Sequence, residues 1–97
     1  MPQNDPDRRR GHRIAFTMPA PVSTGTGNDD LIEDSSTIDI SDSGVRLRLR
    51  GHIEPGQIVY VHLNKHPEQC RVVWTNSVVG SDQLIAGLEF TSPMPDI

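Results

Sequence analysis

Apolar and polar residues alternate along the second half of the chain with the two-residue period of a half-buried β-strand. The clearest run is Val45–Arg50, VRLRLR, in which an arginine follows every apolar residue. Thr37–Ser41, TIDIS, alternates in the same way, and β-branched or aromatic runs occupy residues 58–63, 70–74 and 84–90. Turn-forming residues separate these runs, so the pattern predicts short antiparallel strands and no helix.

The first third of the chain is less regular. Residues 14–22 form an apolar run, but Pro19 and Pro21 forbid a helix interior and favour an edge strand. Residues 23–36 are mostly Ser, Thr, Gly, Asn and acids, which predicts a long loop. Residues 1–13 are polar, rich in arginine and without periodicity, and we expect a flexible arm there.

Together these runs predict an all-β protein, a small six-stranded antiparallel β-barrel over residues 14–92 with a short tail at 93–97. Closing the barrel would protect the edges of its strands. The length of 97 residues allows one domain. A domain of this size buries only about 60% of the surface of its unfolded chain, which leaves little room for a deep pocket.

The composition argues against a membrane-spanning or secreted protein. Only 34% of the residues are hydrophobic, and no apolar run approaches the roughly 20 residues of a membrane helix. The first residues are polar, unlike a signal peptide. The single cysteine, Cys70, lies in an apolar run, and we expect it to be buried and unreactive. The sequence therefore predicts a cytoplasmic protein without membrane insertion.

The charge is negative overall but unevenly distributed. The net charge of -4, from 9 basic and 13 acidic residues, argues against a general nucleic-acid-binding protein. Four of the basic residues nevertheless fall within six positions, at Arg8, Arg9, Arg10 and Arg13. A small local anion site fits this distribution better than an extended basic face.

This arginine cluster is the first candidate motif. The planar guanidinium group can donate two parallel hydrogen bonds to a phosphate or to the O6/N7 edge of guanine. Arg9 and Arg13 are four positions apart, so on a flexible arm they can converge on one ligand from two sides. A solvated basic tail is the competing interpretation of the cluster on its own.

The second candidate motif is DISDSG, which begins at Asp39. Residues two apart in a strand share a face, so Asp39 and Ser41 point the same way. Ile38 and Ile40 point the other way. A carboxylate can accept hydrogen bonds from N1 and N2 of guanine, with a hydroxyl beside it. We expect Gly44 to supply the positive φ of a tight turn. An ordinary hairpin with a polar outer face is the competing interpretation.

RxxxR followed after a gap by (D/N)xSxxG resembles the signature of the PilZ family. The gap between Arg13 and Asp39 is 25 residues, within the range that the family tolerates. The resemblance continues through GVRLRL, EPGQIVYVHL, CRVVW and AGLEF in the usual order, and it covers about residues 8–92. It implies a six-stranded barrel that binds cyclic di-GMP, a bacterial second messenger.

The resemblance also implies the residues that would bind the ligand, which are Arg8, Arg9, Arg13, Asp39, Ser41 and Gly44. The arginines of RxxxR would grip phosphates and guanine, the aspartate and serine would hold a guanine edge, and the glycine would shape the turn. Arg8, just before RxxxR, would influence whether one ligand or an intercalated pair is held. We expect Asp39 and Ser41 to contact ligand without supporting the fold.

Other residues suggest less chemistry. The four histidines form no close ligand cluster, so we expect no metal and no cofactor. No histidine is expected beside a serine as the base of a nucleophile. Trp74 is expected in the core or barrel wall, with a base-stacking platform as the alternative. The arginines of Val45–Arg50 are expected on a solvated outer face, with positive potential near the ligand as the alternative.

These features predict a cyclic di-GMP receptor, not an enzyme, that transmits ligand binding to a protein partner as an adaptor. A PilZ-like interaction module that binds no nucleotide is the alternative. A barrel that binds single-stranded nucleic acid needs exposed aromatic residues along a basic groove. This chain has four aromatic residues and a negative net charge, which disfavours that class.

Overall fold

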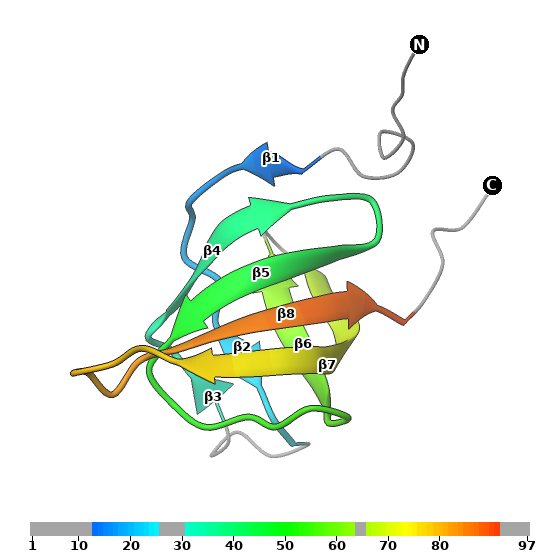
Figure 1. The fold of residues 1–97 in the computed structure, drawn as a ribbon. Helices are drawn as coiled ribbons and strands as arrows, with labels where there is room; N and C mark the ends of the chain where they lie inside the picture. The colour runs from blue at the N-terminus through cyan, green and yellow to red at the C-terminus, as the bar shows by residue number, and fades with distance from the viewer. Residues whose placement is uncertain (1–12, 26–30, 64–65, 92–97) are drawn as a thin grey trace, which may run out of the picture.

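The computed structural model describes residues 13–25, 31–63 and 66–91, which form one antiparallel sheet of eight strands (Figure 1). The strand order in space is β1-β4-β5-β8-β7-β6-β2-β3. The strands are β1 (Ile14–Ala15), β2 (Val22–Ser23), β3 (Leu31–Ile32), β4 (Ser35–Ile40), β5 (Gly44–Leu49), β6 (Ile58–Leu63), β7 (His66–Ser77) and β8 (Leu84–Phe90). This part of the chain contains no helix that could cross a membrane.

The chain from β1 to β2 borders two distant strands and thereby curls the sheet. β1 pairs with β4 through Ile14 and Ile40, and Pro19 forms a bridge to Ser36 further along β4. β2 then pairs with β6 at Val22. Figure 1 shows the barrel-like shape that results. The predicted all-β, barrel-like class is therefore confirmed.

The number of strands differs from the six predicted. The apolar run at residues 14–22 is divided between β1 and β2, because Pro19 and Pro21 have no N–H to donate to a continuous ladder. β3 lies within residues 23–36, where a loop is predicted, and pairs with β2. β7 begins at His66, inside a predicted turn, because its first residues pair with the end of β6.

The core lies on the inner face of the curled sheet. β5 contributes Val45, Leu47 and Leu49, which are all buried, while the arginines between them face outwards as predicted. The other strands and loops complete the core with Ala20, Val22, Ile53, Val59, Val61, Cys70, Val72, Ala86 and Leu88. The prediction that Cys70 is buried is confirmed, and burial raises the pKa of its thiol to about 12.

Two β-bulges interrupt the alternation of inward and outward side chains. In β4 the register shifts between Thr37 and Asp39, and in β7 it shifts between Val72 and Trp74. Each bulge adds one residue, which moves the residues after it to the opposite face of the sheet. Thr37, before the bulge, is buried on the core side opposite Leu47, whereas Asp39, after the bulge, lies opposite an outward arginine.

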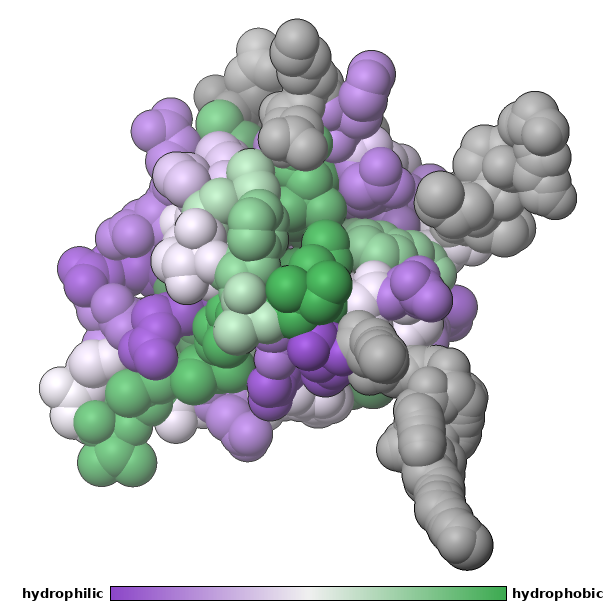
Figure 2. Space-filling view, turned by 90° about the horizontal axis from the view of Figure 1, so that it is seen from above, coloured by the Kyte–Doolittle hydropathy of each residue, from purple (hydrophilic) through white to green (hydrophobic). Residues whose placement is uncertain are grey.

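Some apolar side chains remain at the surface. Ile14 and Phe16, in and beside the edge strand β1, are 62% and 43% exposed, and Val79 at the tip of the β7–β8 hairpin is 97% exposed. Figure 2 views the molecule from the β1 side and shows apolar and hydrophilic surface next to each other. Apolar residues distributed in this way are common on small domains and do not by themselves mark a binding surface.

Candidate functional site

One row of residues crosses five neighbouring strands on the outer face of the sheet. In spatial order it consists of Ala15, Asp39, Arg46, Gly87 and Trp74. Both bulges lie directly beside this row. Without the first bulge Asp39 would oppose Val45, which faces the core. Without the second, Trp74 would oppose Ala86, which is equally buried. The bulges therefore bring the aspartate and the indole to the same face.

The carboxylate of Asp39 is the polar centre of the row. Nε of Arg46 donates to both carboxylate oxygens at 3.0 Å, and its Nη2 also contacts Oδ2. Nε of Arg13 donates to Oδ1 at 3.1 Å. Only 9% of the Asp39 side chain is exposed. Hydrogen bonding from Arg46 holds the pKa of Asp39 below its ordinary value of 3.8; burial acts against this shift, and Arg13 adds to it.

Arg13 reaches Asp39 because the chain that follows it is fastened to β4. The backbone N–H of Thr37 donates to the carbonyl of Met18 at 2.9 Å. The buried hydroxyl of Thr37 accepts a hydrogen bond from the N–H of Met18 at 3.0 Å and donates to the carbonyl of Phe16. These bonds hold the first strand along the edge of β4 and so place Arg13 at the end of the row.

Ser41 lies beside Arg13 where β4 turns into β5, and Gly44 lies beside Ser41. Nη1 of Arg13 is 3.4 Å from Oγ of Ser41, and the N–H of Ser41 donates to the carbonyl of Gly44 at 2.8 Å. Gly44 does not have the positive φ predicted for it. Its lack of a side chain instead permits close packing, because a Cβ there would lie 2.0 Å from the carbonyl oxygen of Leu88.

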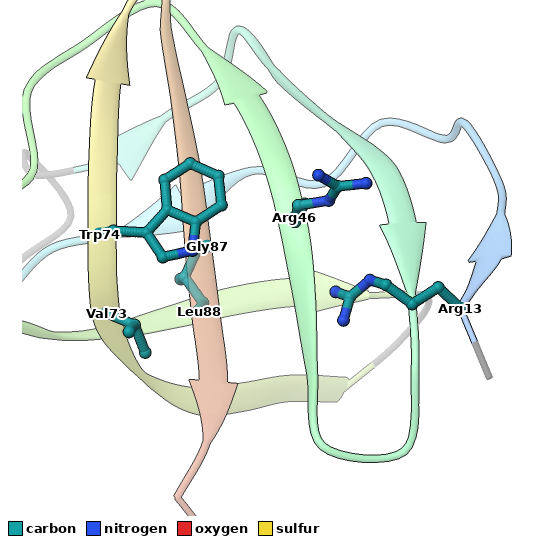
Figure 3. A pocket seen from close by; sticks show the side chains of 6 residues that line it. All are labelled: Arg13, Arg46, Val73, Trp74, Gly87 and Leu88. Atoms are coloured by element: carbon teal, nitrogen blue, oxygen red, sulfur yellow. The ribbon is translucent and has the colours of Figure 1, made fainter. Parts of the chain in front are cut away.

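An open hollow of about 330 Å³ lies over the row (Figure 3). Its lining residues are Arg13, Arg46, Val73, Trp74, Gly87 and Leu88. In Figure 3 the two guanidinium groups lie to one side of β8, and the indole of Trp74 reaches over β8 from β7. Two cations beside an apolar wall suit a ligand that combines an anionic group with a flat ring.

The structure brings together four of the six predicted ligand residues, namely Arg13, Asp39, Ser41 and Gly44. The other two, Arg8 and Arg9, lie outside the described residues. The arginines in and directly after β5 divide into two groups. Arg46 lines the hollow, whereas Arg48 donates to Gln83 at 3.1 Å and Arg50 contacts acids in two turns.

Trp74 is the residue of this site whose position the sequence pattern does not reveal. It is half-buried on the outer face, where it lines the hollow. Residues 70–74 read as one continuous β-run, and strict alternation from Val72 would give Trp74 the same inward direction. The bulge at Val73, which the residue types do not reveal, places Trp74 on the outer face instead.

A second polar pair lies away from the row. Oγ of Ser23 and Nε2 of His62 are 2.9 Å apart, so the expectation that no histidine lies beside a serine is wrong. The pair joins β2 to β6, two strands that the row does not cross. Within residues 13–25, 31–63 and 66–91, no group of three or more His, Cys, Asp or Glu side chains could hold a metal ion.

The fold and the hollow define a small barrel-like β domain with two arginines beside an open hollow on its outer face. The PilZ domain family model matches residues 7–97, nearly the whole chain, and the chain therefore belongs to the PilZ domain family. This is a family of binding and adaptor domains associated with cyclic di-GMP. A search of curated proteins found no match to the chain.

Proposed function

We propose that this domain is a cytoplasmic receptor for cyclic di-GMP that acts as an adaptor and catalyses no reaction. The observation that carries the proposal is the convergence of Arg13 and Arg46 on Asp39, directly beside the hollow that Trp74 lines. Membership of the PilZ domain family supports the choice of ligand. The net charge of -4 supports a discrete anionic ligand over nucleic acid.

A cyclic dinucleotide presents two phosphates and two guanines, so it needs cations and a flat apolar surface together. The guanidinium groups of Arg13 and Arg46 can donate in pairs to a phosphate or to the O6/N7 edge of guanine. The indole of Trp74 can stack on a base, an interaction of about 1–3 kcal/mol per base. Asp39 and Ser41 can accept hydrogen bonds from guanine N1 and N2.

The N-terminal segment would complete the site. Arg13 is the last residue of RxxxR and already lies at the hollow, so the residues before it connect directly to the site. We assign Arg8 and Arg9 to the part of the ligand that extends out of the hollow. Charge-assisted hydrogen bonds from Arg8 and Arg9 to the ligand would favour ordering of the segment before Arg13 and would oppose its entropic cost. That ordering would create or remove a surface for a protein partner.

Titration calorimetry with cyclic di-GMP, and with GTP and cyclic di-AMP as control ligands, tests the proposal. We expect saturable binding of cyclic di-GMP and much weaker binding of both controls. Arg9→Ala and Arg13→Ala should each weaken binding by about 1.5–3 kcal/mol, the contribution of a hydrogen bond to a charged group. Absence of binding heat at high micromolar cyclic di-GMP would overturn the proposal and leave an interaction module that binds no nucleotide.

A further inference from the structure

Gly87 lies in the middle of the row, between Arg46 on β5 and Trp74 on β7. It is buried, and its backbone does not have the positive φ that would favour glycine. A Cβ at this position would lie 2.3 Å from Nε1 and 2.4 Å from Cε2 of Trp74. The indole therefore occupies the space that a side chain at position 87 would fill.

The contact with Gly87 determines where the indole of Trp74 lies. In Figure 3 the ring reaches across β8 from β7 and forms one side of the hollow. A methyl group on Gly87 would force the ring to rotate away from β8. The neighbours of Gly87 along the strand, Ala86 and Leu88, are core residues on the other face. The ring can therefore move without repacking the core.

We propose that Gly87 is a positioning residue, which by its lack of a side chain seats the indole of Trp74 against β8 and so fixes the plane on which a base stacks. The part of this inference that concerns ligand rests on the proposed function. A ring that is already seated does not have to lose side-chain freedom when the ligand arrives, which favours binding. Gly87 would thus act on the ligand through the position of Trp74.

The position of the indole against Gly87 can be tested in the ligand-free protein. Trp74 is the single tryptophan of the chain, so its fluorescence reports this ring alone. Gly87→Ala should shift the emission to longer wavelength and increase quenching by acrylamide. Ile85→Val, two positions earlier on β8 and outside the hollow, is the matched control and should leave both unchanged. Unchanged emission and quenching in Gly87→Ala would overturn the inference.

Calorimetry with cyclic di-GMP tests the consequence for binding. Gly87→Ala should weaken binding about tenfold, within the range of one base–aromatic stack, and should cause no further loss in a Trp74→Ala background. An equal loss in both backgrounds would show that Gly87 does not act through the indole. If the wild type binds no cyclic di-GMP, the proposed function fails, whereas the quenching comparison still decides whether Gly87 seats the ring.

A folding control completes the design. If Gly87→Ala does not fold, the double variant Gly87→Ala/Trp74→Ala should fold, because the close contacts of the added Cβ are with the indole. Thermal unfolding followed by circular dichroism measures this rescue. Failure of the double variant to fold would place the conflict elsewhere and overturn the inference.

Discussion

Asp39 and Arg46 lie opposite each other on β4 and β5, and Nε of the arginine donates to both carboxylate oxygens at 3.0 Å. Arg13 approaches the same carboxylate from the β1 side, with its Nε 3.1 Å from Oδ1 of Asp39. One aspartate therefore holds both arginines of the hollow in place. The sequence motif suggests a purely ligand-binding role for Asp39, but its burial and ion pairs indicate that it also organises the site before ligand binds.

The stability of the free domain should depend on Asp39 in acid. The pKa of this carboxyl is lowered in the folded state from its ordinary value of 3.8, chiefly by the hydrogen bond from Arg46. The ionised carboxylate therefore stabilises the fold at pH values above that ordinary pKa. That contribution is lost as the pH falls below this value and through the folded-state pKa. Thermal unfolding between about pH 6 and pH 2 should show a shallower loss of stability for Asp39→Asn than for wild type.

Asp42→Asn is the matched control for this experiment, because Asp42 is an exposed aspartate in the turn that follows β4. The stability of the Asp42→Asn variant should follow the wild-type curve in acid. If Asp39→Asn and wild type lose stability in parallel, the ion pairs of Asp39 contribute nothing to the folded state.

Arg46→Ala should weaken binding of cyclic di-GMP by about 1.5–3 kcal/mol, whereas Arg48→Ala should change it little. The two substitutions remove the same charge from the same face of β5. Only Arg46 lines the hollow, however, whereas Arg48 donates to Gln83. Calorimetry on both variants separates a specific contact from general positive potential. Equal losses would mean that net charge, and not the position of Arg46, governs binding.

The number of ligands per chain should depend on Arg8. Cyclic di-GMP can associate into an intercalated pair with four phosphate charges, which needs more cationic partners than one molecule does. A long cation just before RxxxR can reach the second molecule, so we expect two ligands per chain for wild type and one for Arg8→Leu, with binding retained. Calorimetric stoichiometry measures both values. A wild-type ratio of one would remove Arg8 from the site.

The thiol of Cys70 should be unreactive in the folded domain. Burial raises its pKa to about 12, so very little of the reactive thiolate forms near pH 8. A chromogenic disulfide reagent should therefore label the native domain very slowly and the denatured chain rapidly. The signal is unambiguous because the chain has one cysteine. Fast labelling in native buffer would instead show that β7 opens locally.

The alternation in Val45–Arg50 was sufficient to predict β5, its buried face and its outward arginines, because regular strand geometry alone determines those features. The motif beginning at Asp39 likewise indicated residues that the structure brings together with Arg13. Nothing in the local residue types reveals that Ile38 and Val73 are extra residues, since bulges depend on pairing with β5 and β8. Trp74 therefore could not be assigned to the hollow from the pattern.

The role of Gly44 was also beyond the pattern. A glycine after Asp-Ser suggests a turn with positive φ, which is a local property of the backbone. Its actual constraint comes from Leu88, 44 positions further along the chain, whose carbonyl oxygen leaves no room for a Cβ. Contacts between residues so distant in sequence are fixed only when the sheet has formed.

Under the proposed function, the two bulges mean that ligand recognition depends on the number of residues in β4 and β7 as well as on their kinds. Deleting Val73 would leave all five residues of the row in the sequence and would allow a regular ladder between β7 and β8. The same deletion would turn the indole of Trp74 towards the core or slip the strand by one position. Single-residue insertions or deletions within β4 and β7 would therefore abolish ligand binding in variants of this chain whose signature motifs are intact.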